Sequence, residues 1–396
     1  MPATNAEPLI GAPSEGLLAR LAGLPSPALL YDLDNLRRSV ELLRADVEAV
    51  GPAELNLALK ACHTPRVLSF LASLGLGADV ASVGELTLAV LAGFRRITAT
   101  GPSFRAGDLP LLEEHGVVPD ASSAEQLDEF CTARPGRPVG LRLRVPLPEA
   151  IEDGSTTFGA GSRFGVYATD PRIGAVLERT GCRLTRLHTH TGQMTPRHLR
   201  YKLRYLLAVA ASYPDVEEID LGGGFFSLYT DRLRTLRTWQ QVAEDLADFT
   251  RRTGRTVRLQ FEPGGAVLAP HGYLVTTVRS VERDHPHFRA DVLTVDCSAW
   301  NFAPWHKPQL VPLTGPRQDE RLRPTLLAGD TLYENDFFGT DVLGRRTAAP
   351  LPALRAGDRV VLTASGAYTR TNSRRFNLLP LPAEYALADG KVEELG

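Results

Sequence analysis

Lysine is scarce in this sequence. Only four of its 44 basic residues are lysines, at Lys60, Lys202, Lys307 and Lys391, and the rest are arginines. A GC-rich genome accounts for the bias, but the consequence is chemical. Any reaction that needs a primary amine has four candidates.

Other features are missing as well. The four cysteines lie far apart and form no Cys-x-x-Cys pair, which argues against structural zinc and a disulfide framework. The 44 basic and 46 acidic residues leave a net charge of −2, without the basic excess of a nucleic-acid or anionic-membrane protein. No run approaches the ~20 apolar residues of a membrane span, and Met1–Gly11 lacks the features of a secretory signal. We therefore expect a cytoplasmic protein without a nucleic-acid or membrane partner.

Short β-rich runs alternate with stretches of helical spacing over residues 28–270. The alternation predicts a parallel sheet, and this many repeats favour a closed (β/α)₈ barrel of the TIM type. The expected strands are Ala28–Tyr31, Leu55–Leu59, Gly77–Val80, Val139–Val145, Leu184–His190, Val216–Leu221 and Val257–Phe261. Residues 271–396 instead read as strands between Pro/Gly-rich turns. We predict an α/β barrel domain (28–270) and a mainly-β domain (271–396) completed by the N-terminal segment 1–27.

Polar residues stand where the expected barrel strands end, and chemistry in such barrels lies at the carboxyl ends of the strands. They are Lys60, Asp79, Arg142 (Arg144 in the alternative register), His190, Gly222–Gly224 and Glu262. A barrel with a purely structural role has no need for such a series.

Two of these strand ends are rich in glycine. Gly222–Gly224 follow Leu221, and Gly264 and Gly265 follow the Glu262-Pro263 pair. Without Cβ atoms the backbone can approach an anion closely and point N–H groups at a phosphate. A tight turn explains either loop alone, but two such loops on late barrel strands favour a phosphate site.

Lys60 ends an apolar strand, where a lysine is costly unless it is used. Apolar surroundings also favour the neutral amine that Schiff-base chemistry needs. The alternative is a rim lysine that pairs with a carboxylate. Lys202 lies in an arginine-rich helix and is expected on a solvated face, Lys391 is near the C-terminus, and Lys307 is the one rival.

An amine, phosphate loops, an acid and a histidine together match pyridoxal 5′-phosphate. Its aldehyde needs the amine, its phosphate needs backbone donors, and its pyridine nitrogen needs a carboxylate to stay protonated. Glu262 would hold the nitrogen, and His190 would stack on the ring. We expect no metal.

The motifs resemble those of the fold-type III pyridoxal-phosphate enzymes, the alanine-racemase-like barrels, and within them the diaminopimelate, ornithine and arginine decarboxylase branch. The resemblance runs from Ser26 to Asn377. One such motif would be weak evidence, but six in the family's order are specific. They are Ala58–Ala61, Gly77–Leu86, His188–Gly192, Gly222–Phe225, Glu262–Gly264 and Gly366–Tyr368.

This resemblance implies a homodimeric amino-acid decarboxylase whose active sites are shared between subunits. Lys60 would carry the cofactor, Glu262 would stabilise its protonated ring nitrogen, and Lys60 or Tyr333 would return a proton after CO₂ is lost. The catalytic residues would thus be Lys60, His190, Glu262 and Tyr333. The cofactor-binding residues would be Lys60, Asp79, Arg142, His190, Gly222, Gly223, Gly224, Glu262, Gly264, Gly265 and Tyr368.

Two positions depart from the family pattern. Gly265 stands where the branch usually has arginine, and Leu332, followed by Tyr333, stands at the place of the active-site cysteine. Tyr333 is either a replacement proton donor or a packing residue. The expected substrate-binding residues are Asp336, which would hold a distal amine, and Asp296 and Trp300, with packing in the β domain as the alternative for Trp300. With Trp305 and His306, these departures suggest an amino acid or conjugate from a specialised pathway, such as siderophore or antibiotic assembly.

Three alternatives stay open. His188 and His190 put two imidazoles on one strand face, as in metal-dependent amidohydrolase barrels, although there the pair comes early in the chain. A non-catalytic decarboxylase-like binding protein fits the missing cysteine but has no use for the retained cofactor set. A racemase of the same fold needs a second base, which Tyr333 could supply. Glu262 favours decarboxylation, because racemases of this fold usually pair the pyridine nitrogen with arginine.

Overall fold

The computed structural model describes residues 12–151, 158–229, 231–302, 308–313, 321–340 and 344–396. The chain divides into two compact units. The described part of the first is 39–60 and 68–266, and that of the second is 12–38, 61–67 and 267–396 without the gaps just given. Lys307, Trp305 and His306 lie outside the described residues.

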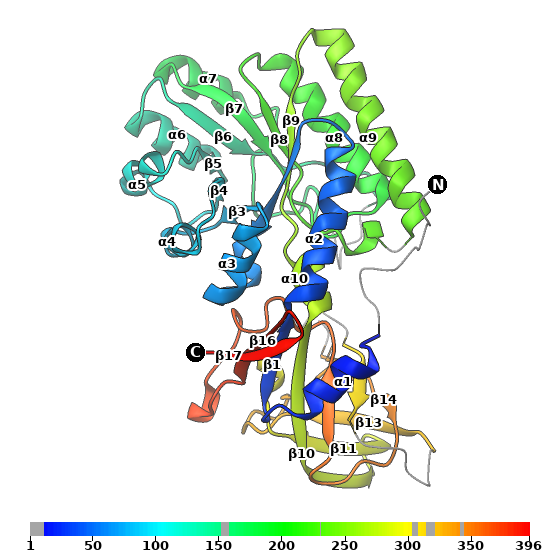
Figure 1. Cartoon of the computed structure of the whole chain (residues 1–396). Helices are drawn as coiled ribbons and strands as arrows, with labels where there is room; N and C mark the ends of the chain where they lie inside the picture. The colour runs from blue at the N-terminus through cyan, green and yellow to red at the C-terminus, as the bar shows by residue number, and fades with distance from the viewer. Residues whose placement is uncertain (1–11, 152–157, 230, 303–307, 314–320, 341–343) are drawn as a thin grey trace. The chain divides into compact units, whose positions relative to one another are not determined.

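The first unit contains a closed, all-parallel barrel with strands in sequence order, which confirms the predicted (β/α)₈ fold (Figure 1). The ring closes where β9 pairs with β2. The short strands β4 and β5 were not among those expected. The barrel strands are β2 (Ala53–Ala58), β3 (Gly77–Val80), β4 (Ile97–Thr100), β5 (Pro119–Ala121), β6 (Pro138–Arg142), β7 (Arg183–His188), β8 (Glu218–Asp220) and β9 (Arg258–Phe261).

Helices follow the strands and begin at polar caps. Ser82 accepts a hydrogen bond from Glu85 N at 3.2 Å, and Ser123, Asp170, Thr195 and Asp231 cap later helices in the same way. The helices of this unit are α4 (Val83–Ala92), α5 (Leu109–Glu114), α6 (Ala124–Ala133), α7 (Pro171–Thr180), α8 (Pro196–Ser212) and α9 (Arg232–Thr253). Elsewhere in the described residues, α1 (Glu15–Ala22) belongs to the second unit, and the unit boundaries fall within α2 (Leu33–Glu48), α3 (Pro65–Ser73) and α10 (Gly265–Leu268).

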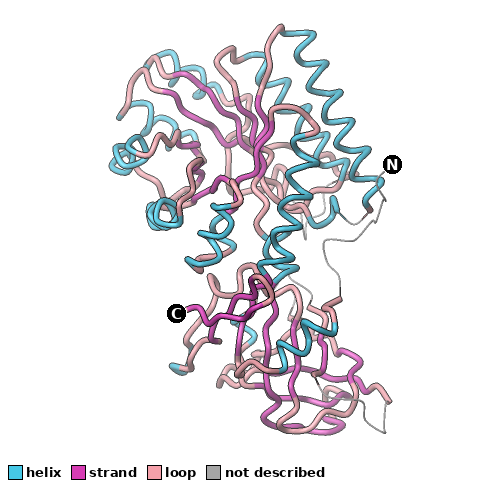
Figure 2. The backbone as a smooth tube through the Cα atoms, viewed as in Figure 1, coloured by secondary structure: helices cyan, strands magenta, loops and turns pink. Residues whose placement is uncertain are grey.

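The second unit is built on a nine-stranded mixed sheet, and Figure 2 shows how little helix accompanies it. The strand expected at residues 28–31 forms, but it lies in this sheet, antiparallel to β10 and parallel to β16. The strands are β1 (Ala28–Asp32), β10 (Gly272–His285), β11 (Ala290–Val295), β12 (Leu310–Pro312), β13 (Arg323–Ala328), β14 (Ala349–Leu351), β15 (Arg359–Leu362), β16 (Ala383–Ala388) and β17 (Lys391–Leu395). N-terminal and C-terminal strands thus form one sheet, as predicted, but the N-terminal strand is β1, which was expected in the barrel domain and lies outside segment 1–27.

The interior of the barrel is polar, whereas branched apolar residues usually fill such barrels. Asn56 of β2 contacts Thr98 of β4 at 3.4 Å, across the strand between them. Glycines on neighbouring strands leave room for these side chains. A Cβ on Gly77 would lie 2.0 Å from Asn56 Oδ1, and one on Gly140 would lie 1.8 Å from Asp120 Oδ1.

No helix among the described residues combines the length and apolarity needed to cross a membrane. The four cysteines are buried free thiols.

Candidate active site at the carboxyl ends of the barrel strands

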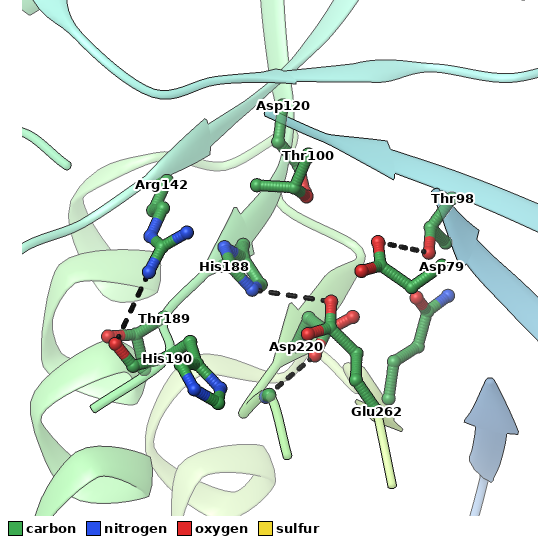
Figure 3. A network of polar contacts seen from close by, with 12 residues as sticks. Asp79, Thr98, Thr100, Asp120, Arg142, His188, Thr189, His190, Asp220 and Glu262 are labelled. Atoms are coloured by element: carbon green, nitrogen blue, oxygen red, sulfur yellow. Dashed lines mark hydrogen bonds and ion pairs between the residues drawn. The ribbon is translucent and has the colours of Figure 1, made fainter. Parts of the chain in front are cut away.

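The carboxyl ends of the barrel strands bring five side chains together. Three belong to expected site residues, and two belong to residues close to them in the sequence. Asp79 lies on β3, Arg142 ends β6, His188 ends β7, Asp220 ends β8, and Glu262 follows β9. Figure 3 shows four of them, Asp79, His188, Asp220 and Glu262, converging from four strands. These four are buried, and Arg142 is partly exposed.

Glu262 carries a carboxylate oxygen that lacks a donor. Oε1 lies 3.3 Å from His188 Nε2, but in the described part of the chain neither atom has a hydrogen-bonding partner of acceptable geometry. Burial lowers the pKa of His188 well below its ordinary value, so the imidazole is neutral. A buried acceptor without a donor is costly. This oxygen therefore marks a position where an N–H group of a bound molecule fits.

A buried arginine that sequence analysis missed holds two further acids. Arg186 Nη2 donates to Asp220 Oδ2 at 2.6 Å and lies 3.5 Å from Asp120 Oδ2. Burial raises the pKa of Asp120 to about 7 and that of Asp220 to about 6, against the lowering effect of Arg186. Burial alone would lower the pKa of Arg186, but Asp120 and Asp220 outweigh it and the net shift is upward. Arg186 lies two residues before His188 and shares its strand face, a signal that the sequence did contain.

Asp79 lies beside this group on β3. Its Oδ1 accepts a hydrogen bond from Thr98 Oγ1 at 3.1 Å. Burial and then the charge of Glu262 raise the pKa of Asp79 well above its ordinary value, and the charge of Lys60 opposes them. The expected acid is therefore present and shares an electrostatic environment with Glu262 and Lys60.

His190 follows β7 with a fixed orientation. Its Nδ1 accepts a hydrogen bond from Gly223 N at 3.2 Å, which assigns the ring proton to Nε2. Burial, followed by the charges of Lys60 and Arg142, lowers the pKa of His190 well below its ordinary value. A neutral imidazole held in this way suits stacking against a flat ring.

Arg142 occupies the first of the two registers considered for this strand. Its Nη2 donates to His190 O at 3.4 Å, and its guanidinium lies 4.8 Å from the centroid of the Phe164 ring. Burial lowers the pKa of Arg142, while the charges of Glu262 and Asp79 act in the opposite direction. Arg144 lies beyond the strand, over the ring of Tyr167.

The backbone conformation and close packing of the loop after β8 require glycine. Gly222 and Gly224 have φ values of +69° and +95°, a region that other residues rarely adopt. A Cβ on Gly223 would lie 2.4 Å from Glu262 O, and one on Gly224 would lie 2.0 Å from Gly192 O. On the other strand end, Gly264 is buried and Gly265 begins α10.

Lys60 lies at the expected strand end, but its exposure differs from the expectation. β2 ends at Ala58, and Lys60 lies in a single 3₁₀ turn, Leu59–Ala61, with its side chain exposed. Its charge contributes to the pKa shifts of Asp79, His188 and His190, which places the amine within electrostatic reach of the site. Lys60 therefore does not pay the cost of burying a lysine.

The expectation that Lys202 lies on a solvated face was wrong. Lys202 is fully buried, and its Nζ donates to Leu221 O at 2.6 Å. It lies two residues from Arg200, and two residues turn a helix by about 200°. The arginine faces Asp245, whereas the lysine faces the core.

Four expected residues belong to the second unit and carry other contacts. Trp300 stacks on Tyr333 with ring centroids 4.8 Å apart. Asp336 Oδ1 accepts from Ala299 N at 2.7 Å, and Asp296 Oδ1 accepts from Thr276 Oγ1 at 2.8 Å. Both carboxylates tie segments of their own unit together, a role that sequence analysis did not foresee.

Tyr368, the expected phosphate ligand, also lies in the second unit. Its φ is +61°, and its backbone N donates to Ala61 O at 2.7 Å. Leu332, which we expect at the place of the family cysteine, has an exposed side chain, and its backbone N donates to Asn377 Oδ1 at 2.9 Å.

The donor set fits a pyridoxal cofactor better than a metal. Among the described residues, His188, Asp220 and Glu262 form the one group with metal-ligand spacing, with their atoms within 4.8 Å of one another. Arg186 already neutralises Asp220 and would repel a cation there. The open oxygen of Glu262 instead suits a protonated pyridine nitrogen, neutral His190 suits its ring, and the glycine loop suits a phosphate.

The fold and the site thus define a barrel enzyme of the pyridoxal-phosphate class. Residues 33–269 match the family described as pyridoxal-dependent decarboxylase, pyridoxal binding domain. The chain belongs to this family of amino-acid decarboxylases, and pyridoxal phosphate is its cofactor.

Similar proteins cover nearly the whole chain. Diaminopimelate decarboxylase of Escherichia coli K12 is 26% identical over 403 residues, which span 96% of this chain and 93% of the relative. The enzyme of the same name from Streptomyces coelicolor is 27% identical over 401 residues, spanning 96% and 88%. The crystal structure of diaminopimelate decarboxylase from Helicobacter pylori complexed with L-lysine has a TM-score of 0.79 at 21% identity, and the match covers 95% of each chain. At that identity the structure supports the fold alone.

Proposed function

We propose that this protein removes CO₂ from an α-amino acid or an amino-acid conjugate. Pyridoxal phosphate, when bound, supplies an aldehyde for the substrate amine and a ring that accepts the electron pair left by CO₂. Lys60 would hold the cofactor through its aldehyde and would release that aldehyde to the substrate amine. Glu262 keeps a proton on the ring nitrogen. The open, buried Oε1 of Glu262 is the observation that carries this proposal.

The other residues orient the cofactor in this proposal. His190 stacks on the ring, and Asp79 and Arg142 lie beside it. Phosphate is held by backbone N–H groups of the glycine-rich strand ends and by Tyr368. The residues of the two strand ends are Gly222, Gly223, Gly224, Gly264 and Gly265.

Replacing Lys60 by alanine tests the assignment. We expect wild-type protein purified with the cofactor to absorb visible light, and Lys60→Ala to lose this absorbance and all CO₂ release, because Lys60 supplies the amine in this proposal. Absorption spectroscopy measures the change. Lys391→Ala, which removes an exposed lysine on β17, is the matched control and should keep both. Unchanged colour in Lys60→Ala would refute the role of Lys60.

The substrate belongs to a specialised pathway in this proposal, of the siderophore or antibiotic kind. The departures at Leu332 and Gly265 support it. Because the Helicobacter pylori relative is described in complex with L-lysine, a substrate with a distal amine is the first candidate. Asp336, Asp296 and Trp300 remain predicted substrate contacts, although the two carboxylates have partners in their own unit.

A screen of CO₂ release over free and conjugated amino acids identifies the substrate. With that substrate, Tyr333→Phe should lower turnover at least about tenfold if the hydroxyl returns the proton, since a general acid typically contributes 10²–10⁴-fold. Phe376→Leu, which alters the same aromatic cluster through its contact with Trp300, serves as the control. Exchange of the α-proton without CO₂ release would favour the racemase alternative.

A homodimer with shared active sites and a cytoplasmic location complete the proposal. Buried free thiols at all four cysteines fit a reducing compartment.

A further inference from the structure

Lys202 is a buried cation that the proposed reaction does not use. It lies on the apolar stripe of α8 at helical spacing and is 0% exposed. Burying an ammonium is costly unless the charge is paired or used, and a methionine or leucine would fill this position more cheaply. The other members of the stripe are Leu199, Leu203 and Leu206.

The ammonium of Lys202 binds the residue that begins the glycine loop. Nζ donates to Leu221 O at 2.6 Å. In a regular parallel ladder Glu262 N would donate to Leu221 O. It donates to Gly222 O at 3.0 Å instead. Leu221 O therefore lacks its hydrogen bond within the sheet, and Lys202 Nζ supplies the donor instead. This bond fixes the residue at which the loop leaves the strand.

The charge of Lys202 lies among the groups of the site. Asp220 and Glu262 act to keep it protonated, while burial, the largest influence, lowers the pKa of Lys202 to about 7 and the charge of Arg142 acts with it. An ammonium has three N–H donors, and the bond to Leu221 occupies one of them. The glycines of the two strand ends carry no charge, so a dianion bound there needs a cation from elsewhere.

We propose that Lys202 is a cationic positioning residue of the phosphate site, which anchors the Leu221 carbonyl and places positive charge next to the Gly222–Gly224 loop. The inference rests on the proposed function. It predicts that the phosphate group of the cofactor, rather than its ring, depends on Lys202.

Binding of phosphorylated and unphosphorylated cofactor tests this inference. The full-length apoprotein is titrated with pyridoxal phosphate and with pyridoxal, by equilibrium dialysis, for the wild type and Lys202→Met. Methionine keeps most of the volume and removes the charge. We expect the affinity for pyridoxal phosphate to fall about 10-fold to 100-fold, the range for loss of a charged hydrogen bond, and the affinity for pyridoxal to change less than about threefold.

Leu203→Ala is the matched control. It loosens the same buried stripe without removing charge and should weaken both ligands equally. Equal losses for both ligands in Lys202→Met, or no loss, would overturn the inference and leave the proposed function intact. A wild-type protein that binds neither ligand would refute the proposed function itself.

If Lys202→Met does not fold, the wild type provides the test. Between about pH 7 and 9 the phosphate stays dianionic, while Lys202 loses its proton. The groups facing it are Asp220, Glu262, Arg142 and His190. The affinity for pyridoxal phosphate relative to pyridoxal should fall over this range, because effects on the ring and the amine cancel in the ratio. A constant ratio would overturn the inference.

Discussion

Inside the barrel, charged side chains from different strands lie close to one another. Asp120 on β5 receives a hydrogen bond from Thr100 Oγ1 at 2.7 Å, and Arg186 of β7 lies 3.5 Å away. Gly140 makes room for its carboxyl group. Because burial disfavours the charged carboxylate, Asp120 holds a proton in the folded protein at a pH where the unfolded chain has released it.

This difference predicts a pH dependence of stability. The pKa of Asp120 is raised to about 7, so the folded state binds the proton more tightly than the unfolded state does. The stabilisation of the folded state by this proton is lost as pH rises from about 4 through 7. The free energy of unfolding should therefore fall by about 1 kcal/mol per pH unit in this window from this group. Asp120→Asn should remove that slope. Urea unfolding of full-length protein at several pH values measures it.

Asp248→Asn is the control for the pH experiment. Asp248 lies on α9 with its side chain half exposed, and Arg252 lowers its pKa. Its effect on stability therefore falls below pH 4, outside the window. An Asp120→Asn variant with the slope of the wild type would contradict the assignment of the proton.

At the scale of elements, the turn after β8 positions the candidate site. The glycines permit the backbone conformation of this loop. In it, Gly222 O accepts a hydrogen bond from Glu262 N, and Gly223 N donates one to His190 Nδ1. Lys202 holds the start of the same turn. Strand, loop and helix α8 would thus act as one support for the phosphate in the proposed site.

Gly224→Ala should damage this support. The φ of +95° disfavours alanine, and its Cβ would lie 2.0 Å from Gly192 O. We expect the affinity for pyridoxal phosphate to fall at least about tenfold, since the shifted amides lose hydrogen bonds to the anion. Equilibrium dialysis of the refolded variant measures it.

Gly254→Ala separates strain from site damage. Gly254 ends α9 with a φ of +71°, and nothing lies within 4 Å of an added Cβ. It should cost about 1 kcal/mol of stability and leave cofactor affinity unchanged. Equal affinities in both glycine variants would contradict the role of the loop.

The sequence predicted the strands that have a clear apolar pattern and missed the short strands that lack one. The strand Gly77–Val80 has the expected bounds, because its apolar pattern is a local signal. β4 and β5 are short and rich in polar residues, with the sequences Ile-Thr-Ala-Thr and Pro-Asp-Ala, so no apolar run marks them. The strand expected at Val139–Val145 ends at Arg142, because pairing with β7, and not propensity, sets its end.

At the scale of the whole molecule, the proposed homodimer can be tested with one residue from each unit. Lys60 belongs to the first unit and Tyr368 to the second. In the proposed homodimer, Tyr368 of one subunit serves the Lys60 of the other. Two inactive variants can then complement each other.

Mixing Lys60→Ala and Tyr368→Ala subunits tests the shared site. Random pairing would leave about a quarter of the sites intact, because each mixed dimer has one site with both residues. Activity after mixing measures complementation, and sedimentation equilibrium gives the mass. Lys60→Ala mixed with Glu262→Gln is the control, since both residues lie in one unit. A monomer, or no recovery with Tyr368→Ala, would contradict the shared site.

The sequence by itself determined the barrel, the glycine loops and the family, because hydrophobic period, caps and ordered motifs are all local in the chain. Only the tertiary structure decided which polar residues meet. It exposed Lys60, buried Lys202 and placed Arg186 between two acids. Burial and pairing depend on strands and helices distant in sequence, and the energy of a charge depends on both. The four lysines can be identified from the sequence at once, but the sequence did not show which of them is buried in the core.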